Sequence, residues 1–227
     1  MRKLVLWGHH VKEYQAMFAL SDELNNSSVL EFGCGPSAVN ATLASRGQVV
    51  ASIDPLFKFE LEPLRQDVLA LFNSRAVQIK AKPAQFDVRE YGGLDAFIAK
   101  RREGLELFFA DFVAGRREQR YLPLTEGPLP FITGLFDYVL SSHFLFADAD
   151  TQSITYHLET ICELARVAHE VRIFPLIDSQ GTPSLLLGPV LLGLQQANYG
   201  VEVREVSYSL YPQGNAMLRV WAKQCEV

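Results

Sequence analysis

The sequence is poor in cysteine. Its 227 residues include only Cys34, Cys162 and Cys225, and no two of these form a Cys-x-x-Cys pair. A disulfide framework or a structural zinc site needs more cysteines at closer spacing. The five histidines show no familiar metal-ligand spacing such as His-Glu-x-x-His. We therefore expect neither disulfides nor a metal site.

Long apolar runs are also missing. The longest, residues 185–194, contains two glycines and a proline and is too short to span a bilayer. The N-terminal residues lack the long apolar region and the small-residue cleavage site of a signal peptide. We therefore expect a cytoplasmic protein with no membrane span.

There is no excess of positive charge. The chain has 21 lysines and arginines against 26 aspartates and glutamates, a net charge of −5. Proteins that grip duplex nucleic acid need a concentrated basic surface. We expect no nucleic-acid partner, and the charge balance favours a small-molecule or protein substrate. The expected state of the chain is a monomer or a homodimer.

Several catalytic signatures are absent as well. The sequence has no Gly-x-Ser-x-Gly nucleophile elbow and no Walker A loop. None of the cysteines follows a proline, as the nucleophile of cytosine-C5 methylating enzymes does. These absences argue against serine hydrolases, P-loop nucleotide hydrolases and cytosine-C5 methylation.

What is present is an alternation of strand-length apolar runs with helical patterns, which predicts a doubly wound α/β fold around a parallel sheet. We expect a single domain over residues 1–227, with an N-terminal cap helix within residues 1–26 and a helical crossover or cover within 60–119. The expected strands cover residues 29–32, 48–53, 121–125, 138–141 and 171–176. The expected helices cover residues 11–24, 37–44, 63–73, 94–117, 151–168 (with Asp150 or Thr151 as cap) and 183–200.

The end of the chain predicts a reversed strand. Residues 201–209 and 216–222 both have strand character, and only a short turn joins them. Strands joined by so short a connection run antiparallel, because a parallel return needs a crossover. We therefore predict a Rossmann-like seven-stranded sheet whose last strand is antiparallel.

The helix expected over residues 94–117 has two different faces. Apolar residues recur at spacings of three, four and seven and form one face. The other face carries Lys100, Arg101, Arg102, Glu103 and Glu106. We interpret these charges as a solvated face; the alternative is a lid whose arginines meet an acidic substrate.

A glycine turn follows the first expected strand. Gly33 and Gly35 let the chain turn sharply and let a ligand approach the backbone. Asp54 closes the next strand, and neighbouring strand ends meet at the carboxyl edge of such a sheet. A carboxylate there can accept both hydroxyl hydrogens of a ribose. This pattern predicts an adenosine-binding site.

Two cofactor classes fit this pattern. Gly33, Gly35 and Ala38 satisfy the loose dinucleotide fingerprint, so NAD remains an alternative. A carboxylate beside a pyrophosphate would be repelled, however, and Glu31 lies two residues before the first glycine. Pro36 also lacks an N–H group for phosphate binding. These residues favour a cationic ligand; the alternative role for Glu31 is that of a paired strand-end carboxylate.

The stretch Val29-Leu30-Glu31-Phe32-Gly33-Cys34-Gly35-Pro36 resembles motif I of class I S-adenosylmethionine (SAM)-dependent methyltransferases. Ser52-Ile53-Asp54-Pro55 resembles the ribose-binding acid of that family. Residues 129–131 and 136–143 are similar to the fourth-strand region of small-molecule enzymes of the ubiquinone/menaquinone-methylase type. The resemblance implies SAM as cofactor and S-adenosylhomocysteine (SAH) as product. It implies cofactor contacts from Glu31, Gly33, Cys34, Gly35, Pro36, Asp54, Pro55, Leu56, Thr125, Glu126, Ser141 and Ser142.

The chain departs from the family pattern at the expected adenine contact and in the length of one insertion. An aspartate that meets the adenine amino group usually stands where this chain has Thr125, followed by Glu126. Threonine accepts a hydrogen bond without carrying charge, so either residue can serve. The insertion before the third strand is also long, and we interpret it as a substrate cover.

Methyl transfer from a sulfonium has no single catalytic signature, because the cofactor supplies the leaving group. His143, just after the fourth expected strand, has a suitable unperturbed pKa for a general base; the alternative is a histidine that only packs under the loop. Tyr14 is a candidate for the substrate pocket, or else an ordinary core tyrosine. The leading hypothesis is a small-molecule methyltransferase. The alternatives are an NAD-dependent oxidoreductase and a non-catalytic SAM-fold binding protein.

Overall fold

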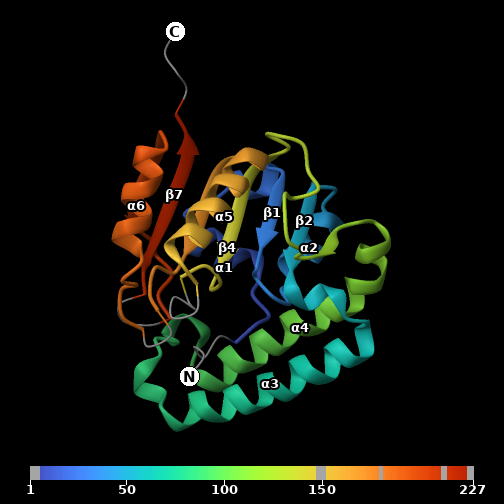
Figure 1. Cartoon of the computed structure of the whole chain (residues 1–227). Coiled ribbons are helices and arrows are strands. Elements are labelled where there is room, and N and C mark those ends of the chain that lie inside the picture. Colours follow the sequence, from blue (N-terminus) through green and yellow to red (C-terminus); the bar gives the residue numbers. More distant parts are fainter. Residues whose placement is uncertain (1–5, 147–151, 179–180, 211–213, 224–227) are drawn as a thin grey trace.

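The computed structural model describes residues 6–146, 152–178, 181–210 and 214–223. A seven-stranded sheet runs through its centre, in the order β3-β2-β1-β4-β5-β7-β6 (Figure 1). The strands are β1 (Val29–Phe32), β2 (Val50–Asp54), β3 (Tyr121–Pro123), β4 (Phe136–Ser142), β5 (Ala168–Phe174), β6 (Tyr199–Glu205) and β7 (Ala216–Ala222).

Only β7 is reversed. It pairs antiparallel with both β5 and β6, whereas β1 pairs parallel with β2 and β4, and β2 with β3. The predicted fold class, a Rossmann-like sheet with an antiparallel last strand, is confirmed. All four residues of β1 and all five of β2 are buried, as expected for central strands covered on both faces.

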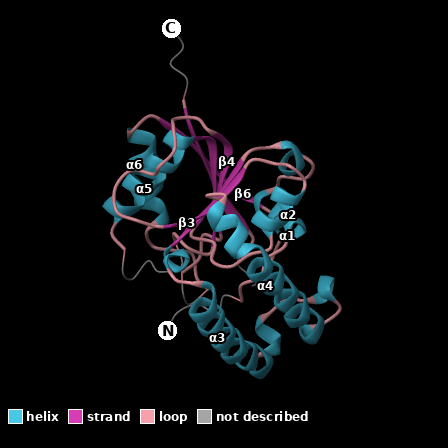
Figure 2. Ribbon diagram, turned by 90° about the vertical axis from the view of Figure 1, so that its right-hand side faces the viewer, coloured by secondary structure: helices cyan, strands magenta, loops and turns pink. Residues whose placement is uncertain are grey.

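Helices cover both faces of the sheet. On one face lie α5 (Ile154–Val167) and α6 (Leu187–Gln196), and on the other α1 (Val11–Phe18) and α2 (Val39–Ser45) (Figure 2). Two further helices, α3 (Leu61–Ala81) and α4 (Leu94–Arg117), lie together beyond the end of the sheet toward which β1 points (Figure 1). That end is the carboxyl edge of the parallel strands, where ligands bind in such folds.

Several element bounds differ from those predicted. The first helix ends at Phe18 and not at residue 24, because Arg172 of β5 donates hydrogen bonds to the Phe18 and Ala19 carbonyls. A cation at a helix C-terminus compensates the helix dipole. Ala19 then takes a left-handed conformation, with φ 48°. A long-range contact therefore ends this helix.

The other differences have local causes. α3 starts at Leu61 and continues to Ala81, eight residues beyond the predicted end at residue 73, and Pro63 lies in its first turn, where proline is tolerated. α6 is shorter than predicted because Pro183 pairs with Ile177 in an isolated bridge. Gly200 belongs to β6, which begins at Tyr199 and ends at Glu205.

The start of α5 also differs. Its N-cap is Ser153, whose hydroxyl accepts a hydrogen bond from the Tyr156 amide at 3.0 Å. The predicted caps, Asp150 and Thr151, lie outside the described residues. The bounds predicted for residues 29–32, 94–117 and 216–222 agree with β1, α4 and β7.

The connection from β3 to β4 differs from the other parallel crossovers. Residues 124–135, all of them described, form no helix, whereas β1–β2 and β4–β5 are joined through α2 and α5. A cavity of about 560 Å³ remains between this loop and α5. Among the described residues, no helix is long and apolar enough to cross a membrane.

Candidate functional site

The glycine turn and the acid after β2 meet at the carboxyl edge of the sheet. The Gly35 amide donates a hydrogen bond to Asp54 Oδ2 at 2.7 Å, and the Leu56 amide donates to Oδ1 at 2.9 Å. Gly33 and Gly35 have φ of 67° and 65°, the left-handed region that glycine favours. The two groups that the sequence placed in one site are therefore in direct contact.

Asp54 is almost fully buried, with 4% of its surface exposed. Burial raises its pKa to about 6, although the hydrogen bonds from the Leu56 and Gly35 amides oppose this. Each carboxylate oxygen has a second lone pair, so Asp54 can still accept two further hydrogen bonds. These are the acceptors that a ribose would use.

Glu31 lies beneath the same turn. Its two oxygens accept hydrogen bonds from Ser37 Oγ at 2.7 Å and Ser52 Oγ at 2.6 Å. Burial raises its pKa, although these two hydroxyls favour the charged form. This is the arrangement of a paired strand-end carboxylate, the alternative that the sequence left open. A role of Glu31 toward a cationic ligand stays a prediction.

The segment before α1 lies on the glycine turn. Gly8 donates a backbone hydrogen bond to the Pro36 carbonyl at 3.0 Å, and Ala38 donates to the His9 carbonyl at 2.9 Å. The indole of Trp7 fills the space beside Gly35: a β-carbon there would lie 2.4 Å from the Trp7 Nε1 atom. A ligand that approaches this side of Gly35 has to displace Trp7.

The other side of this segment packs against α4. A β-carbon on Gly8 would lie 2.0 Å from the Arg101 carbonyl oxygen, and one on Gly104 would lie 2.2 Å from the Gly8 carbonyl oxygen. His10 Nε2 is 2.9 Å from the Lys100 carbonyl oxygen. The segment of residues 6–10 therefore lies between the glycine turn and α4.

Arg101 corrects one sequence interpretation. It does not lie on a solvated face of α4, since only 1% of its surface is exposed. Its guanidinium bonds Glu13 of α1 at 2.9 and 3.0 Å and the Tyr208 hydroxyl at 2.8 Å, while Tyr91 donates a further hydrogen bond to Glu13. Arg101 stands four residues after Phe97 and four before Leu105. That spacing, which places it in the apolar stripe, is the signal that could have found it.

His143 follows β4 at the carboxyl edge, as predicted. Its backbone is left-handed, with φ 59°, and its Nδ1 lies 2.7 Å from Ser142 Oγ. A non-glycine residue held in this conformation stores strain that often accompanies function. Its ring stacks on His9, with centroids 5.2 Å apart and planes inclined by 22°.

The sequence did not reveal the surroundings of His9. It is buried, and burial lowers the pKa of its imidazole well below 6.5, with the charge of Arg101 and the neighbouring His143 adding to the effect. The ring is therefore neutral at neutral pH. No periodicity marks this position, because it precedes α1.

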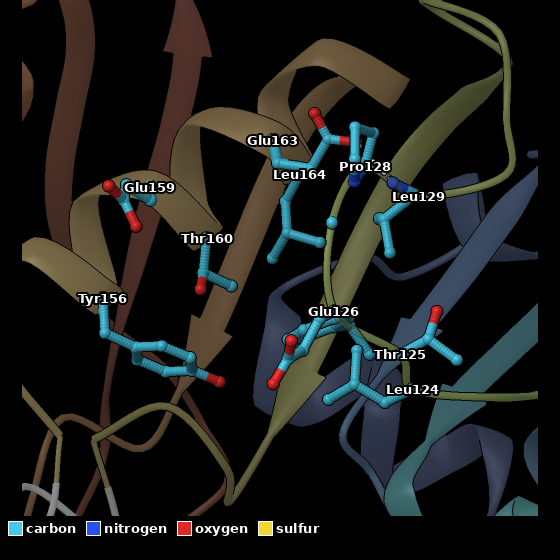
Figure 3. A pocket seen from close by; sticks show the side chains of 12 residues that line it. Leu124, Thr125, Glu126, Pro128, Leu129, Tyr156, Glu159, Thr160, Glu163 and Leu164 are labelled. Carbon is cyan, nitrogen blue, oxygen red and sulfur yellow. Dashed lines mark hydrogen bonds between the residues drawn. The ribbon is translucent and has the colours of Figure 1, made fainter.

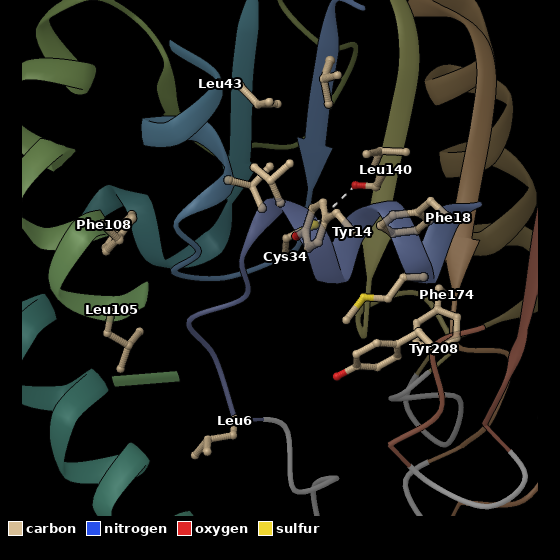
Figure 4. Close-up of a cluster of buried hydrophobic side chains, with 14 of the residues drawn as sticks. Leu6, Tyr14, Phe18, Cys34, Leu43, Leu105, Phe108, Leu140, Phe174 and Tyr208 are labelled. Atoms are coloured by element: carbon tan, nitrogen blue, oxygen red, sulfur yellow. Dashed lines mark hydrogen bonds between the residues drawn. The ribbon is translucent and has the colours of Figure 1, made fainter. Parts of the chain in front are cut away.

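Tyr14 and Cys34 lie next to each other on this side of the sheet (Figure 4). Tyr14 is fully buried, and burial and the nearby Cys34 and Glu31 raise its pKa. The Cys34 thiol donates to the Leu140 carbonyl at 3.3 Å and accepts from the Ser142 amide at 3.3 Å. Burial raises the thiol pKa, so Cys34 acts as a structural thiol. Ser141 and Ser142 are consecutive in β4, so their side chains point to opposite faces.

The predicted adenine contacts line the cavity beside α5. Glu126 extends toward Tyr156 of α5 across it, whereas the Thr125 side chain points away from α5 (Figure 3). Thr160 of α5 and Phe32 at the end of β1 also line the cavity. The remaining lining residues are Leu124, Gly127, Pro128, Leu129, Glu159, Glu163 and Leu164. Pro55 and Leu56 form a short 3₁₀ turn that starts directly after Asp54. The structure thus places the candidate contacts along one edge of the sheet, on both of its faces.

No family model matches the chain. It is 25% identical over 219 residues to an uncharacterised protein of Methanocaldococcus jannaschii, with 96% of each chain covered. Among solved structures it is similar to a TehB-like SAM-dependent methyltransferase from Corynebacterium glutamicum, at 14% identity and TM-score 0.48, covering 96% of this chain and 90% of that one.

Two further solved structures were determined with the cofactor or its product. One is magnesium protoporphyrin IX methyltransferase from Synechocystis with bound SAM, at 14% identity and TM-score 0.47, covering 94% of this chain and 78% of that one. The other is the N-methyltransferase NodS from Bradyrhizobium japonicum with SAH, at 14% identity and TM-score 0.46, covering 94% of this chain and 86% of that one. The strand order of the chain's own sheet, and not these similarities, defines its fold.

Proposed function

We propose that this chain is a SAM-dependent methyltransferase that acts on a small-molecule acceptor. The observation that carries the proposal is the contact between the Gly35 amide and the Asp54 carboxylate at the ends of neighbouring parallel strands. It stands in a sheet whose reversed β7 fits the methyltransferase resemblance better than an all-parallel dinucleotide fold. Asp54 keeps lone pairs for the hydroxyls of a ribose. The cavity at Thr125 and Glu126 offers space for the adenine ring.

Different residues of the chain would bind different parts of the cofactor. Asp54 would accept the ribose hydroxyls, Thr125 or Glu126 would accept from the adenine amino group, and the glycine turn would approach the remainder of the cofactor. The further contacts that we propose come from Glu31, Cys34, Pro36, Pro55, Leu56, Ser141 and Ser142. Bound SAM would supply an activated methyl group and its own leaving group. The protein then has to align an acceptor and exclude water.

The segment of residues 6–10 and α4 would exclude that water. The segment packs against Gly35 on one side and α4 on the other, at the turn where Asp54 and Glu31 are buried. Because Trp7 fills one side of Gly35, this conformation corresponds to a closed cover. Entry of the cofactor from that side requires the cover to open, as lids over active sites commonly do.

Ligand-dependent melting tests the proposal. SAH at a hundredfold its dissociation constant should stabilise the fold by about 2.7 kcal/mol. For a domain of this size that is about 5–10 °C in melting temperature. NAD at the same concentration should have no effect, and Asp54→Ala should reduce the SAH shift. Stabilisation by NAD and not by SAH would reject the methyltransferase proposal in favour of a dinucleotide enzyme.

A further inference from the structure

The sheet ends on an open edge strand. β6 is last in the strand order, and β7 is its only partner among the described strands. Its seven residues include no proline, and the last four of them are exposed. A strand of this kind offers a row of unpaired N–H and C=O groups with which another strand can pair. The edge at β6 is therefore a surface for strand pairing.

The pairing of β6 with β7 shows which backbone groups point away from the sheet. The Val206 amide donates to the Asn215 carbonyl at 2.8 Å, so these two residues form a hydrogen-bonded pair. Hydrogen-bonded and non-hydrogen-bonded pairs alternate along an antiparallel ladder. The outward backbone groups of β6 therefore belong to Tyr199, Val201, Val203 and Glu205.

The side chains of β6 alternate between the two faces of the sheet. Val201 packs on the core beneath α5 and α6, and Val203, on the same face, is 48% exposed. Glu202 and Arg204 lie on the other face, where Glu202 forms an ion pair with Arg219 of β7. Both Glu202 and Arg204 are exposed, so their charges are accessible to a further strand.

These charges favour one register for a second copy of β6. If two antiparallel copies are centred on Val203, Glu202 of each copy lies opposite Arg204 of the other. A pairing centred on Glu202 or on Arg204 would place like charges directly opposite, which destabilises a strand pair. A pairing centred on Glu205 would do the same, and one centred on Val201 would leave Arg204 beyond the partner strand.

We propose that a second copy of this chain pairs with β6, antiparallel and centred on Val203, so that the sheet continues across a two-fold axis. The outward backbone groups of Val201, Val203 and Glu205 then find partners in the second copy. Glu202 and Arg204 form non-hydrogen-bonded pairs, in which side chains lie closest. Because both copies use the same strand, the pairing closes at two chains. The proposal does not depend on the methyltransferase activity.

The size of this interface sets the expected affinity. Strand pairing alone covers less than the roughly 1,000 Å² that specific stable interfaces bury, so we expect a dissociation constant on the order of 10–100 μM. Charges on an edge strand can also serve to prevent pairing, and the chain would then stay monomeric. Sedimentation equilibrium of the full-length protein at up to about 500 μM distinguishes the two. A monomer at every concentration would overturn the proposal.

Charge reversal tests the register. Arg204→Glu places glutamates opposite each other and Glu202→Lys places cations opposite each other, so each variant alone should dimerise at least about tenfold more weakly. An equimolar mixture should dimerise like the wild type, because each reversed charge then meets its opposite. In Glu202→Lys, Arg219 keeps Glu170 as a partner at 2.8 Å. A mixture that dimerises no better than either variant alone would reject this register.

Val203→Pro tests the backbone pairing. It removes an outward N–H group and no bond to β7, and edge strands accept proline at such positions. Dimerisation should be lost, and circular dichroism checks that the fold is retained. Arg117→Glu is the matched control, the same charge change as Arg204→Glu at an exposed residue of α4, and should leave the dissociation constant unchanged. A dimer that persists in folded Val203→Pro, or that Arg117→Glu weakens equally, would contradict the proposal.

Discussion

The buried ion pair between Arg101 and Glu13 makes a sharp prediction about stability. The pair is bidentate, with distances of 2.9 and 3.0 Å, and the two side chains are 1% and 9% exposed. Glu13→Gln would leave the guanidinium buried with only neutral acceptors, the glutamine amide oxygen and the Tyr208 hydroxyl. Removing one member of such a pair costs about 3–5 kcal/mol, because the other charge remains uncompensated.

Removing both charges should cost much less. Arg101→Met combined with Glu13→Gln removes both charges of the pair. A methionine can pack on Phe97, over which the guanidinium now lies at 5.1 Å. Replacing a buried pair by neutral groups is often neutral or stabilising. Urea unfolding of the two single variants and the double variant measures the coupling. A loss below about 1 kcal/mol in Glu13→Gln would refute the buried placement of Arg101, since exposed pairs contribute about that much.

Three further predictions concern the glycine turn and the segment that packs on it. Asp54 has a pKa of about 6 in the folded state, above its unfolded value of 3.8. The free energy of unfolding should therefore fall by about 2.4 kcal/mol as the pH rises from 4 to 7, and urea titrations should show this dependence reduced in Asp54→Asn. Gly8→Ala would clash with the backbone of α4, so it should lower the melting temperature more than Gly92→Ala, which has a similar φ but open space. Trp221→Phe leaves Trp7 as the sole tryptophan, and its fluorescence should change when SAH displaces it; an unchanged spectrum at saturation would show that Trp7 does not move.

The elements that the sequence predicted well are those fixed by local pattern. The bounds of α4 follow from apolar spacing over many turns, and those of β7 from a short apolar run next to a turn. The early end of α1 could not be read in this way, because it depends on Arg172 from a strand far along the chain. Likewise, α6 begins at Leu187 and not at Pro183, because Pro183 pairs with Ile177 outside the helix.

In the candidate site, too, the residues placed by pattern or topology were predicted, and those placed by tertiary packing were not. Gly35 and Asp54 were predicted together because strand ends of a parallel sheet share one edge, and topology alone places them. Arg101 was misplaced because its charge was taken as a sign of exposure, although its spacing from Phe97 puts it in the apolar stripe. His9 and Trp7 belong to no periodic element, so only tertiary packing reveals their surroundings.

The short segment of residues 6–10 links the glycine turn to α4. Trp7 lies against Gly35 of the glycine turn, and Gly8 is in close contact with the backbone of α4. His9, the next residue, is buried and stacks on His143. A ligand that displaces the Trp7 indole from Gly35 therefore acts on a segment whose backbone also bonds the glycine turn and packs against α4.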